Sequence, residues 1–361
     1  MRQIGGHGLF RRTSFIGSGR LSPAEAVRQA RRGTQCHRRV VGQIVSQPWI
    51  EQTPMMTNKG RIKVLYIAGS GRSGSTILHN VLGQIEGYQC VGELRHIWER
   101  GVSRNRLCGC GCPFRQCGVW QAIMRAAFGG MDPVHAEAMF GLAKTIGMND
   151  LPRMSIPRIR DRPLSRLRGY MRDLEALYQA IHTVTGSSVI VDSSKNPAYA
   201  YILRMIPTID LYILHIVRDS RAVAHSWSRK KLFEPGDYMT RQGPFKSALQ
   251  WSSRNVTAEV WLRAVPGRYA RIRYEDFVAS PATSIRDVLN LLGAAAVKMP
   301  FISGDTVDLK ANHSVFGNEV RFQTGPVKLT LDGVWQREMP KSQRLAVTGL
   351  TWPLLLRYGY V

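Results

Sequence analysis

The stretch VLYIAGSGRSGSTILHNVL, residues 64–82, combines an apolar strand, a Gly-rich turn and an apolar helix. This order is typical of a phosphate-binding loop, whose nucleotide-hydrolase form reads G-x-x-x-x-G-K-[ST]. Gly69, Gly74 and Thr76 fit that frame, but Ser75 stands at the lysine position and the nearest cation is Arg72. Backbone N–H groups at a helix N-terminus attract anions. The stretch therefore predicts an anion site that differs from that of an ordinary nucleotide hydrolase.

The same alternation of strand and helix recurs along the chain. Apolar runs at 62–68, 188–194 and 211–217 and a shorter, alternating one at 270–277 precede helical patterns at 75–86, 197–206, 219–231 and 281–293. Continuous apolar strands alternating with helices favour a parallel sheet with both faces covered. The predicted fold class is α/β, a P-loop NTPase-like parallel sheet flanked by helices, with a mostly helical insertion at about 101–187.

The 361-residue chain has a formal net charge of +25, which restricts the classes of partner that it can be expected to bind. Such a balance predicts anionic partners. Aromatic residues do not interleave with a basic stripe, so no specific nucleic-acid partner is expected. No apolar run reaches the roughly 18 residues of a membrane span, and no secretory segment is visible. We expect a cytoplasmic enzyme, with a peripheral membrane contact left open.

Residues 1–60 differ from the rest because they are rich in Arg and nearly free of acids. This composition favours a disordered tail that is dispensable for chemistry. A transit peptide or a start of translation at Met55 or Met56 stays open. We expect the catalytic domain to span 61–361.

A second anion motif is HIVRDSRAVAHSWSRKK, residues 215–231. Arg218 follows a buried strand, and Ser226 lies about two helical turns further on. Ligands of open parallel sheets bind beyond the carboxyl ends of the strands. Because an Arg fork matches a phosphate, Arg218 and Ser226 are predicted to hold one together. Two phosphate motifs imply a ligand with two separate phosphate groups.

Two other function classes stay open from the residues alone. An atypical P-loop kinase or NTPase would need Mg²⁺, for which Asp192 at the end of a strand could supply an acid. A non-enzymatic protein could bind polyanions through the tail and the Arg-rich stretch 153–172.

The sequence resembles the sulfotransferase superfamily, which uses 3′-phosphoadenosine 5′-phosphosulfate (PAPS). GSGRSGSTIL (69–78) resembles the 5′-phosphosulfate loop of that family, and VRDSRAVAHSWSRK (217–230) resembles its 3′-phosphate motif. The details are most similar to the branch of tyrosylprotein sulfotransferases and bacterial sulfotransferases. The resemblance extends through CVGELRHIWERG (90–101), DSSKNP (192–197), RYEDFVASP (273–281) and HSVFGNEVRF (313–322).

The resemblance implies a PAPS donor, no metal for the reaction, and transfer to a hydroxyl or, as the weaker alternative, an amine. It implies Glu93 as the base, and Lys195 and Arg72 as stabilisers of developing charge. An ion pair of Glu93 with Arg95 or Arg72 is the structural alternative. We expect the acceptor to be a small molecule, glycan or lipid, and the net positive charge favours an anionic one. The residues implied to bind the donor are Arg72, Ser73, Gly74, Ser75, Thr76, Arg218, Ser226, Tyr274, Asn318 and Arg321, with Arg221, Arg229 and Lys230 secondary.

Four of the six cysteines lie in CGCGCPFRQC, residues 108–117. Their spacing, C-x-C-x-C-x4-C, is not the paired C-x2-C of a zinc ribbon. A structural loop and a metal or redox role both stay open for these cysteines, and we expect no metal. His215, His225 and His313 are interpreted as packing residues.

Overall fold

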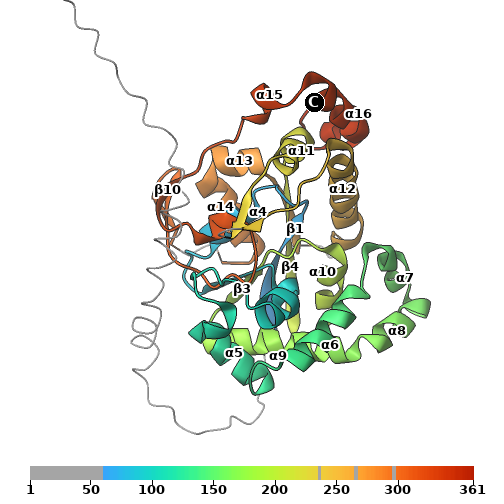
Figure 1. Ribbon diagram of the computed structural model, residues 1–361, viewed down its shortest axis with the longest axis vertical. Coiled ribbons are helices and arrows are strands. Elements are labelled where there is room, and N and C mark those ends of the chain that lie inside the picture. The colour runs from blue at the N-terminus through green and yellow to red at the C-terminus, as the bar shows by residue number, and fades with distance from the viewer. Residues whose placement is uncertain (1–59, 235–236, 264–266, 295–297) are drawn as a thin grey trace, which may run out of the picture.

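The structure, a computed structural model, describes residues 60–234, 237–263, 267–294 and 298–361 (Figure 1). The predicted tail therefore lies outside the described residues apart from Gly60. Within the described ranges, no helix is both long and apolar enough to cross a bilayer.

A five-stranded sheet in the order β2-β3-β1-β4-β7 forms the centre of the fold, and every neighbouring pair in it is parallel. The register aligns Tyr66 of β1 with Asp192 of β3 and with Ile213 of β4. The predicted α/β fold class is confirmed. The strands are β1 (Ile62–Gly69), β2 (Tyr88–Gly92), β3 (Val189–Asp192), β4 (Ile209–Val217) and β7 (Tyr269–Arg273).

Both faces of the sheet are covered, as its apolar strands require. Alternate residues of β1 belong to different cores: Val64 and Tyr66 lie in one buried cluster, and Leu65 and Ile67 in the other. Both clusters exclude water from β1, which explains its continuous apolar run. The helices that follow strands are α4 (Ser75–Leu82), α10 (Pro197–Arg204), α11 (Ser220–Ser228), α13 (Tyr274–Ala279) and α14 (Pro281–Leu291), and α12 (Pro244–Thr257) lies beside α11.

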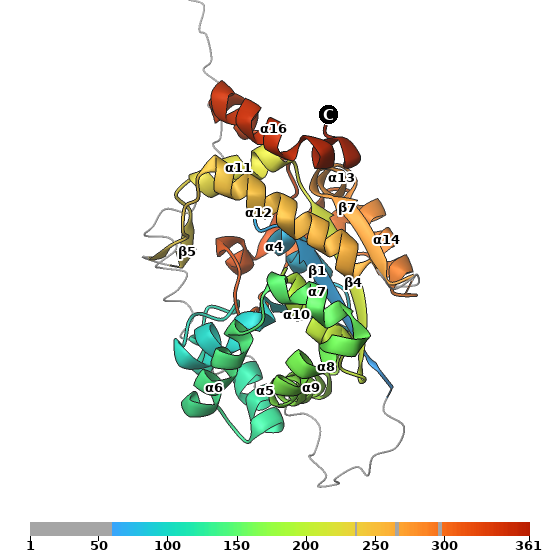
Figure 2. The same ribbon diagram turned by 90° about the vertical axis from the view of Figure 1, so that its right-hand side faces the viewer.

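The insertion between β2 and β3 is mostly helical and gathers at one end of the molecule, the lower end in both views (Figures 1 and 2). Its longest helix buries Leu174, Leu177 and Tyr178 in the same cluster as Val64 and Tyr66. The insertion therefore shares a core with the sheet. Its helices are α5 (Gly118–Phe128), α6 (Pro133–Lys144), α7 (Leu151–Ser155), α8 (Pro157–Arg166) and α9 (Arg168–Thr185).

The structure corrects the sequence prediction at two places in the sheet. The expected strand at 270–277 ends at Arg273, and Tyr274 already begins α13. The edge strand β2 was not predicted as a strand. The chain also forms a hairpin of β5 (Leu232–Glu234) and β6 (Asp237–Tyr238), an antiparallel sheet of β8 (Phe301–Ser303), β9 (Thr306–Leu309) and β10 (Gly325–Lys328), and the helices α15 (Trp335–Glu338) and α16 (Lys341–Arg357).

Candidate functional site

All five parallel strands end at the same edge of the sheet, and each is followed by a predicted site residue. The phosphate loop follows β1, and Glu93 and Lys195 follow β2 and β3. Arg218 and Tyr274 follow β4 and β7. The chain leaves β1 towards the β2 edge and leaves β4 towards the β7 edge. Diverging connections of this kind open a crevice at the carboxyl ends of the strands, where α/β proteins bind ligands.

The phosphate loop turns sharply between β1 and α4, and Gly74 makes that turn possible. Its φ is 85°, in the left-handed region. A Cβ at this position would lie 2.2 Å from Cδ2 of Tyr274. The loop backbone and the Tyr274 ring are therefore in direct contact, and only glycine fits between them.

Three buried polar atoms around this loop have no hydrogen-bond partner within the described part of the chain. They are Oγ of Ser73, Nε of Arg72 and Nε of Arg218. Buried donors without partners are rare, because the desolvation cost stays uncompensated. An anion with several oxygens would satisfy all three. The loop thus fits a phosphate or sulfate group on its own chemistry.

Arg218 connects the two predicted phosphate motifs. Its Nη1 donates to the backbone oxygen of Arg72 over 3.2 Å, and its guanidinium carbon lies 4.6 Å from the ring centre of Tyr274. Its Nη2 donates to the Asp332 carboxylate over 3.2 Å. Asp332 thus holds the guanidinium ready for an anion. Ser226, its predicted partner on α11, is also buried.

Lys231 is a member of this site that the sequence prediction missed. Burial is the main cause that lowers its pKa to about 8; the nearby charges of Arg72, Arg218 and Arg229 act in the same direction and Asp332 opposes them. Clusters of cations are typical of anion-binding sites, where the bound anion compensates the repulsion between the positive charges. The run Arg229-Lys230-Lys231 was the available signal, but a run of basic residues does not show which side chain turns inward.

Glu93 and Lys195 form a direct ion pair at the ends of the neighbouring strands β2 and β3. Nζ of Lys195 lies 2.8 Å from Oε1 of Glu93 and 2.7 Å from the backbone oxygen of Ser193. Burial raises the pKa of Glu93, but Lys195 and His96 outweigh it, so the pKa is lowered. Glu93 is therefore ionised and able to accept a proton. Its partner is Lys195, in place of the Arg95 or Arg72 considered from the sequence.

Asp192, the acid that a magnesium-dependent enzyme would need, is occupied by protein groups. Its carboxylate accepts hydrogen bonds from the hydroxyls of Tyr178 at 2.6 Å and of Ser194 at 2.5 Å. The residue is completely buried, and burial raises its pKa to about 6. Asp192 thus serves the contact between α9 and β3.

The late segment 313–322 lies against the phosphate loop and against Glu93. The backbone N–H of Glu93 donates to the oxygen of Phe316 over 3.2 Å, and a Cβ on Gly317 would meet Thr76 at 3.8 Å. Asn318 caps the short helix Glu319–Phe322. Arg321 is buried and donates to Glu234 over 2.9 Å. In this structure Asn318 and Arg321 thus support the segment, and their predicted contact with the donor stays a prediction.

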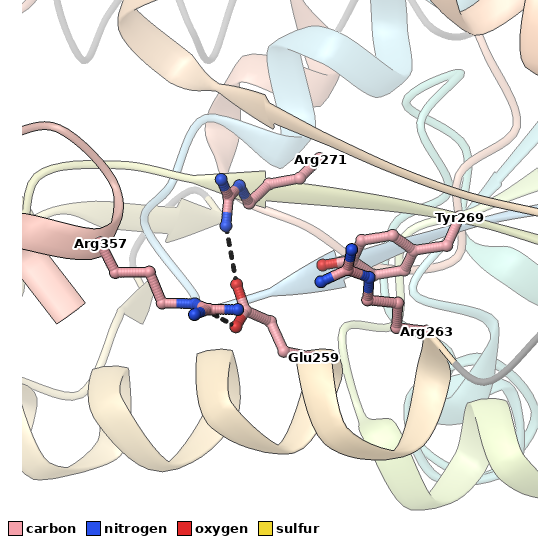
Figure 3. A pocket seen from close by; sticks show the side chains of 5 residues that line it. All are labelled: Glu259, Arg263, Tyr269, Arg271 and Arg357. Carbon is pink, nitrogen blue, oxygen red and sulfur yellow. Dashed lines mark hydrogen bonds and ion pairs between the residues drawn. The ribbon is translucent and has the colours of Figure 1, made fainter.

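One hollow among the described residues lies away from the predicted site. It has a volume of about 460 Å³ and is lined by Glu259, Arg263, Tyr269, Arg271 and Arg357 (Figure 3). Glu259 already pairs with Arg271 at 2.8 Å and with Arg357 at 2.7 Å. None of the predicted site residues lines it.

Part of the chain is similar to a known family. Residues 119–297 match the sulfotransferase family, a range that includes Lys195, Arg218, Ser226 and Tyr274 but not the phosphate loop or Glu93. No curated protein matches the chain.

Several solved structures of sulfotransferases align with low TM-scores. The sulfotransferase domain of the Synechococcus PCC 7002 olefin synthase is 17% identical, with 85% of this chain and 98% of that chain covered and a TM-score of 0.44. A sulfotransferase from Mycobacterium avium is 12% identical, with 92% and 82% covered and a TM-score of 0.41. No property of these proteins is transferred to this chain.

Proposed function

We propose that the chain, whose residues 119–297 match the sulfotransferase family, moves a sulfuryl group from PAPS to a hydroxyl of an acceptor. Transfer to an amine is the weaker alternative. The observation that carries the proposal is a set of buried donors on Ser73, Arg72 and Arg218, at the ends of β1 and β4, that have no partner among the described residues. These donors fit the two phosphate-bearing ends of this donor, whose leaving group is adenosine 3′,5′-bisphosphate.

PAPS supplies the reactive sulfuryl group, and the protein positions the partners. The loop residues Arg72, Ser73, Gly74, Ser75 and Thr76 hold the 5′ end through backbone N–H groups, hydroxyls and one guanidinium. Arg218 and Ser226 hold the 3′-phosphate. Tyr274, which contacts both Gly74 and Arg218, fixes the distance between the loop that binds the 5′ end and the residues that bind the 3′-phosphate.

Glu93 takes the proton of the acceptor hydroxyl while the acceptor oxygen bonds to sulfur and the bond between sulfur and the 5′-phosphate oxygen breaks. This proton neutralises Glu93, so Lys195 loses its ionic partner at 2.8 Å. The freed ammonium then faces the charge that develops on the leaving phosphate. The ion pair thus couples deprotonation of the acceptor to stabilisation of the leaving group.

The acceptor side points to an anionic small molecule, glycan or lipid. The charge of Arg254 acts on Glu93, and Arg254 is itself influenced by Arg95. Arg254 therefore lies close enough to Glu93 to act on its charge, which favours an anionic acceptor. We further propose that 61–361 form the catalytic domain, that the helical insertion shapes the acceptor pocket, and that the enzyme works in the cytoplasm.

A transfer assay with sulfur-labelled PAPS and pools of hydroxylated compounds tests the proposal. We expect the wild type to label an acceptor and Glu93→Gln to be slower by about 10²–10⁴-fold, the usual contribution of a general base. Glu86→Gln, which changes an exposed carboxylate, is the matched control. A Glu93→Gln variant that binds adenosine 3′,5′-bisphosphate and keeps full turnover would overturn the assignment of the base.

A further inference from the structure

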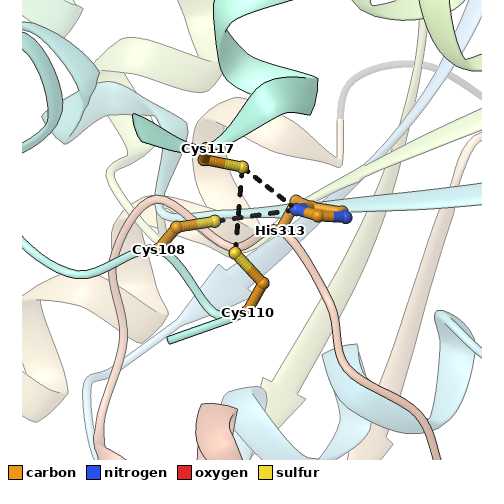
Figure 4. Close-up of side chains that lie close together, drawn as sticks. All are labelled: Cys108, Cys110, Cys117 and His313. Atoms are coloured by element: carbon orange, nitrogen blue, oxygen red, sulfur yellow. Dashed lines mark hydrogen bonds between the residues drawn. The ribbon is translucent and has the colours of Figure 1, made fainter. Parts of the chain in front are cut away.

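Three cysteines of the 108–117 stretch converge on a histidine from the far end of the chain. Sγ of Cys117 lies 3.3 Å from Nδ1 of His313, and Sγ of Cys108 lies 3.8 Å from the same atom. The sulfurs of Cys110 and Cys117 are 3.8 Å apart, and all four ligand atoms lie within 4.8 Å of one another (Figure 4). His313 is 196 residues from Cys117, so only the fold brings them together.

These distances match the edges of a tetrahedral zinc site. With Zn–S of about 2.3 Å and Zn–N of about 2.0–2.1 Å, a tetrahedron has S–S edges of about 3.8 Å and S–N edges of about 3.5 Å. The observed sulfur–sulfur distance of 3.8 Å and the sulfur–nitrogen distances of 3.3 and 3.8 Å agree with those edges. Three thiolates and one imidazole are also a donor set that zinc prefers.

We propose that Cys108, Cys110, Cys117 and His313 bind one Zn²⁺ ion in a closed, structural site. Four protein ligands complete the coordination and leave no open position for water or substrate. The ion therefore has no part in sulfuryl transfer. The proposal departs from our sequence prediction of no metal, which was made without the fourth ligand.

The protein around the four ligands is arranged to support the site. Nε1 of Trp120, which is fully buried, donates to the backbone oxygen of His313 over 2.8 Å. The backbone N–H of Gly109 donates to the oxygen of Ser314 over 2.9 Å. A Cβ on Gly109 would lie 2.1 Å from Oδ1 of Asn312, so only glycine lets the two loops approach this closely. Such outer contacts orient metal ligands before the ion arrives.

Charge in the metal-free cluster is consistent with this chemistry. Burial lowers the pKa of His313, but hydrogen bonds with Cys110 and Cys117 outweigh it and raise the pKa to about 10. Hydrogen bonds from Cys108 and Cys110 lower the pKa of Cys117 far below that of an ordinary thiol. Zn²⁺ would displace protons from the ligand thiols and from Nδ1 of His313, as metal binding to such ligands requires.

The position of the site indicates a structural role for the ion. It would tie the start of the insertion, which carries the cysteines, to the segment that follows His313. In that segment the backbone oxygen of Phe316 accepts the hydrogen bond from the N–H of Glu93 over 3.2 Å. The ion would therefore brace the wall of the catalytic crevice from outside. This role does not depend on which acceptor or donor the enzyme uses.

Metal content of the purified full chain, prepared under reducing conditions, tests the proposal. Elemental analysis should find one zinc per chain in the wild type and background zinc in Cys117→Ser and His313→Ala. Cys90→Ser removes a buried free thiol outside the cluster and should keep the zinc. Cys112→Ser tests the alternative in which all four cysteines bind the ion. This variant should also keep the zinc, because Cys112 is not a proposed ligand. Loss of zinc in Cys112→Ser with retention in His313→Ala would overturn the ligand set.

A second measurement on the wild type avoids variants that fail to fold. Growth with Co²⁺ in place of Zn²⁺ should give the sulfur-to-cobalt charge-transfer bands and the intense visible bands of a tetrahedral thiolate site. Zinc removal by a chelator should lower the thermal midpoint, and Zn²⁺ should restore it. A wild type without zinc, with a weak octahedral cobalt spectrum and with freely reacting thiols, would overturn the proposal.

Discussion

Removal of Lys195 should expose the energetic importance of its ion pair with Glu93. The two side chains are only 7% and 16% exposed. Breaking a buried pair from one side costs about 3–5 kcal/mol, because the remaining charge has lost its partner. We expect about 3 kcal/mol for Lys195→Met, since His96 stays 3.9 Å from Glu93 and the methionine keeps the apolar stem.

The double variant separates the pair from its surroundings. In Glu93→Gln/Lys195→Met no charge is left without a partner, so its loss should be smaller than the sum of the two single losses by about 1–3 kcal/mol. Denaturant unfolding at neutral pH measures each free energy. The Lys328–Asp305 pair, at 3.2 Å but 67% and 41% exposed, is the matched control. Lys328→Met should change stability little, because exposed pairs contribute little.

The pH dependence provides the sharper test. In the wild type the pKa of Glu93 is lowered, so the pair contributes stability above the unfolded pKa and loses it as pH falls through the folded one. Without Lys195, burial dominates and the folded pKa lies above the unfolded one. The variant therefore recovers stability as pH falls through that raised value, and its deficit narrows in mild acid. A deficit that is independent of pH, with additive single losses, would refute the reasoning.

Three further predictions concern the donor site. Arg218→Ala should lower the affinity for adenosine 3′,5′-bisphosphate, measured by calorimetry, by about tenfold to a hundredfold, since a hydrogen bond to a charged group contributes about 1.5–3 kcal/mol. An unchanged affinity would contradict this prediction. Gly74→Ala should lower both the thermal midpoint and this affinity. Gly186 also has a left-handed backbone, with a φ of 62°, but an added Cβ there would meet no described atom within 4 Å. Gly186→Ala should therefore lower only the midpoint, and by less. Because the pKa of Lys231 is lowered to about 8, bisphosphate affinity should fall as pH rises through that value, and the fall should be smaller in Lys231→Met; identical profiles would remove Lys231 from the site.

The sequence predicted the fold well because apolar runs report directly on buried parallel strands. Ile62–Gly69 and Ile209–Val217 were found within two residues at each end. The five-residue strand Tyr88–Gly92 was missed because it is short and follows a glycine turn. The run at 270–277 kept its alternation past Arg273, although the chain there turns into a helix at Tyr274. Local pattern cannot show where a sheet stops.

Contacts between distant residues were the other limit. Glu93 and Lys195 were each predicted, but their pairing depends on β2 lying beside β3, which no periodicity shows. His313 was interpreted as a packing residue because nothing near it in the sequence suggests a ligand. Lys231 was overlooked because burial, which lowers its pKa, is a property of the fold.

The thermal midpoint with adenosine 3′,5′-bisphosphate, without added metal, compared with ATP plus Mg²⁺, tests the central claim most directly. A ligand that binds only the folded state raises the midpoint by mass action. The account predicts a rise with the bisphosphate alone that is lost in Arg218→Ala. A rise with ATP and Mg²⁺ and none with the bisphosphate would contradict the sulfotransferase proposal.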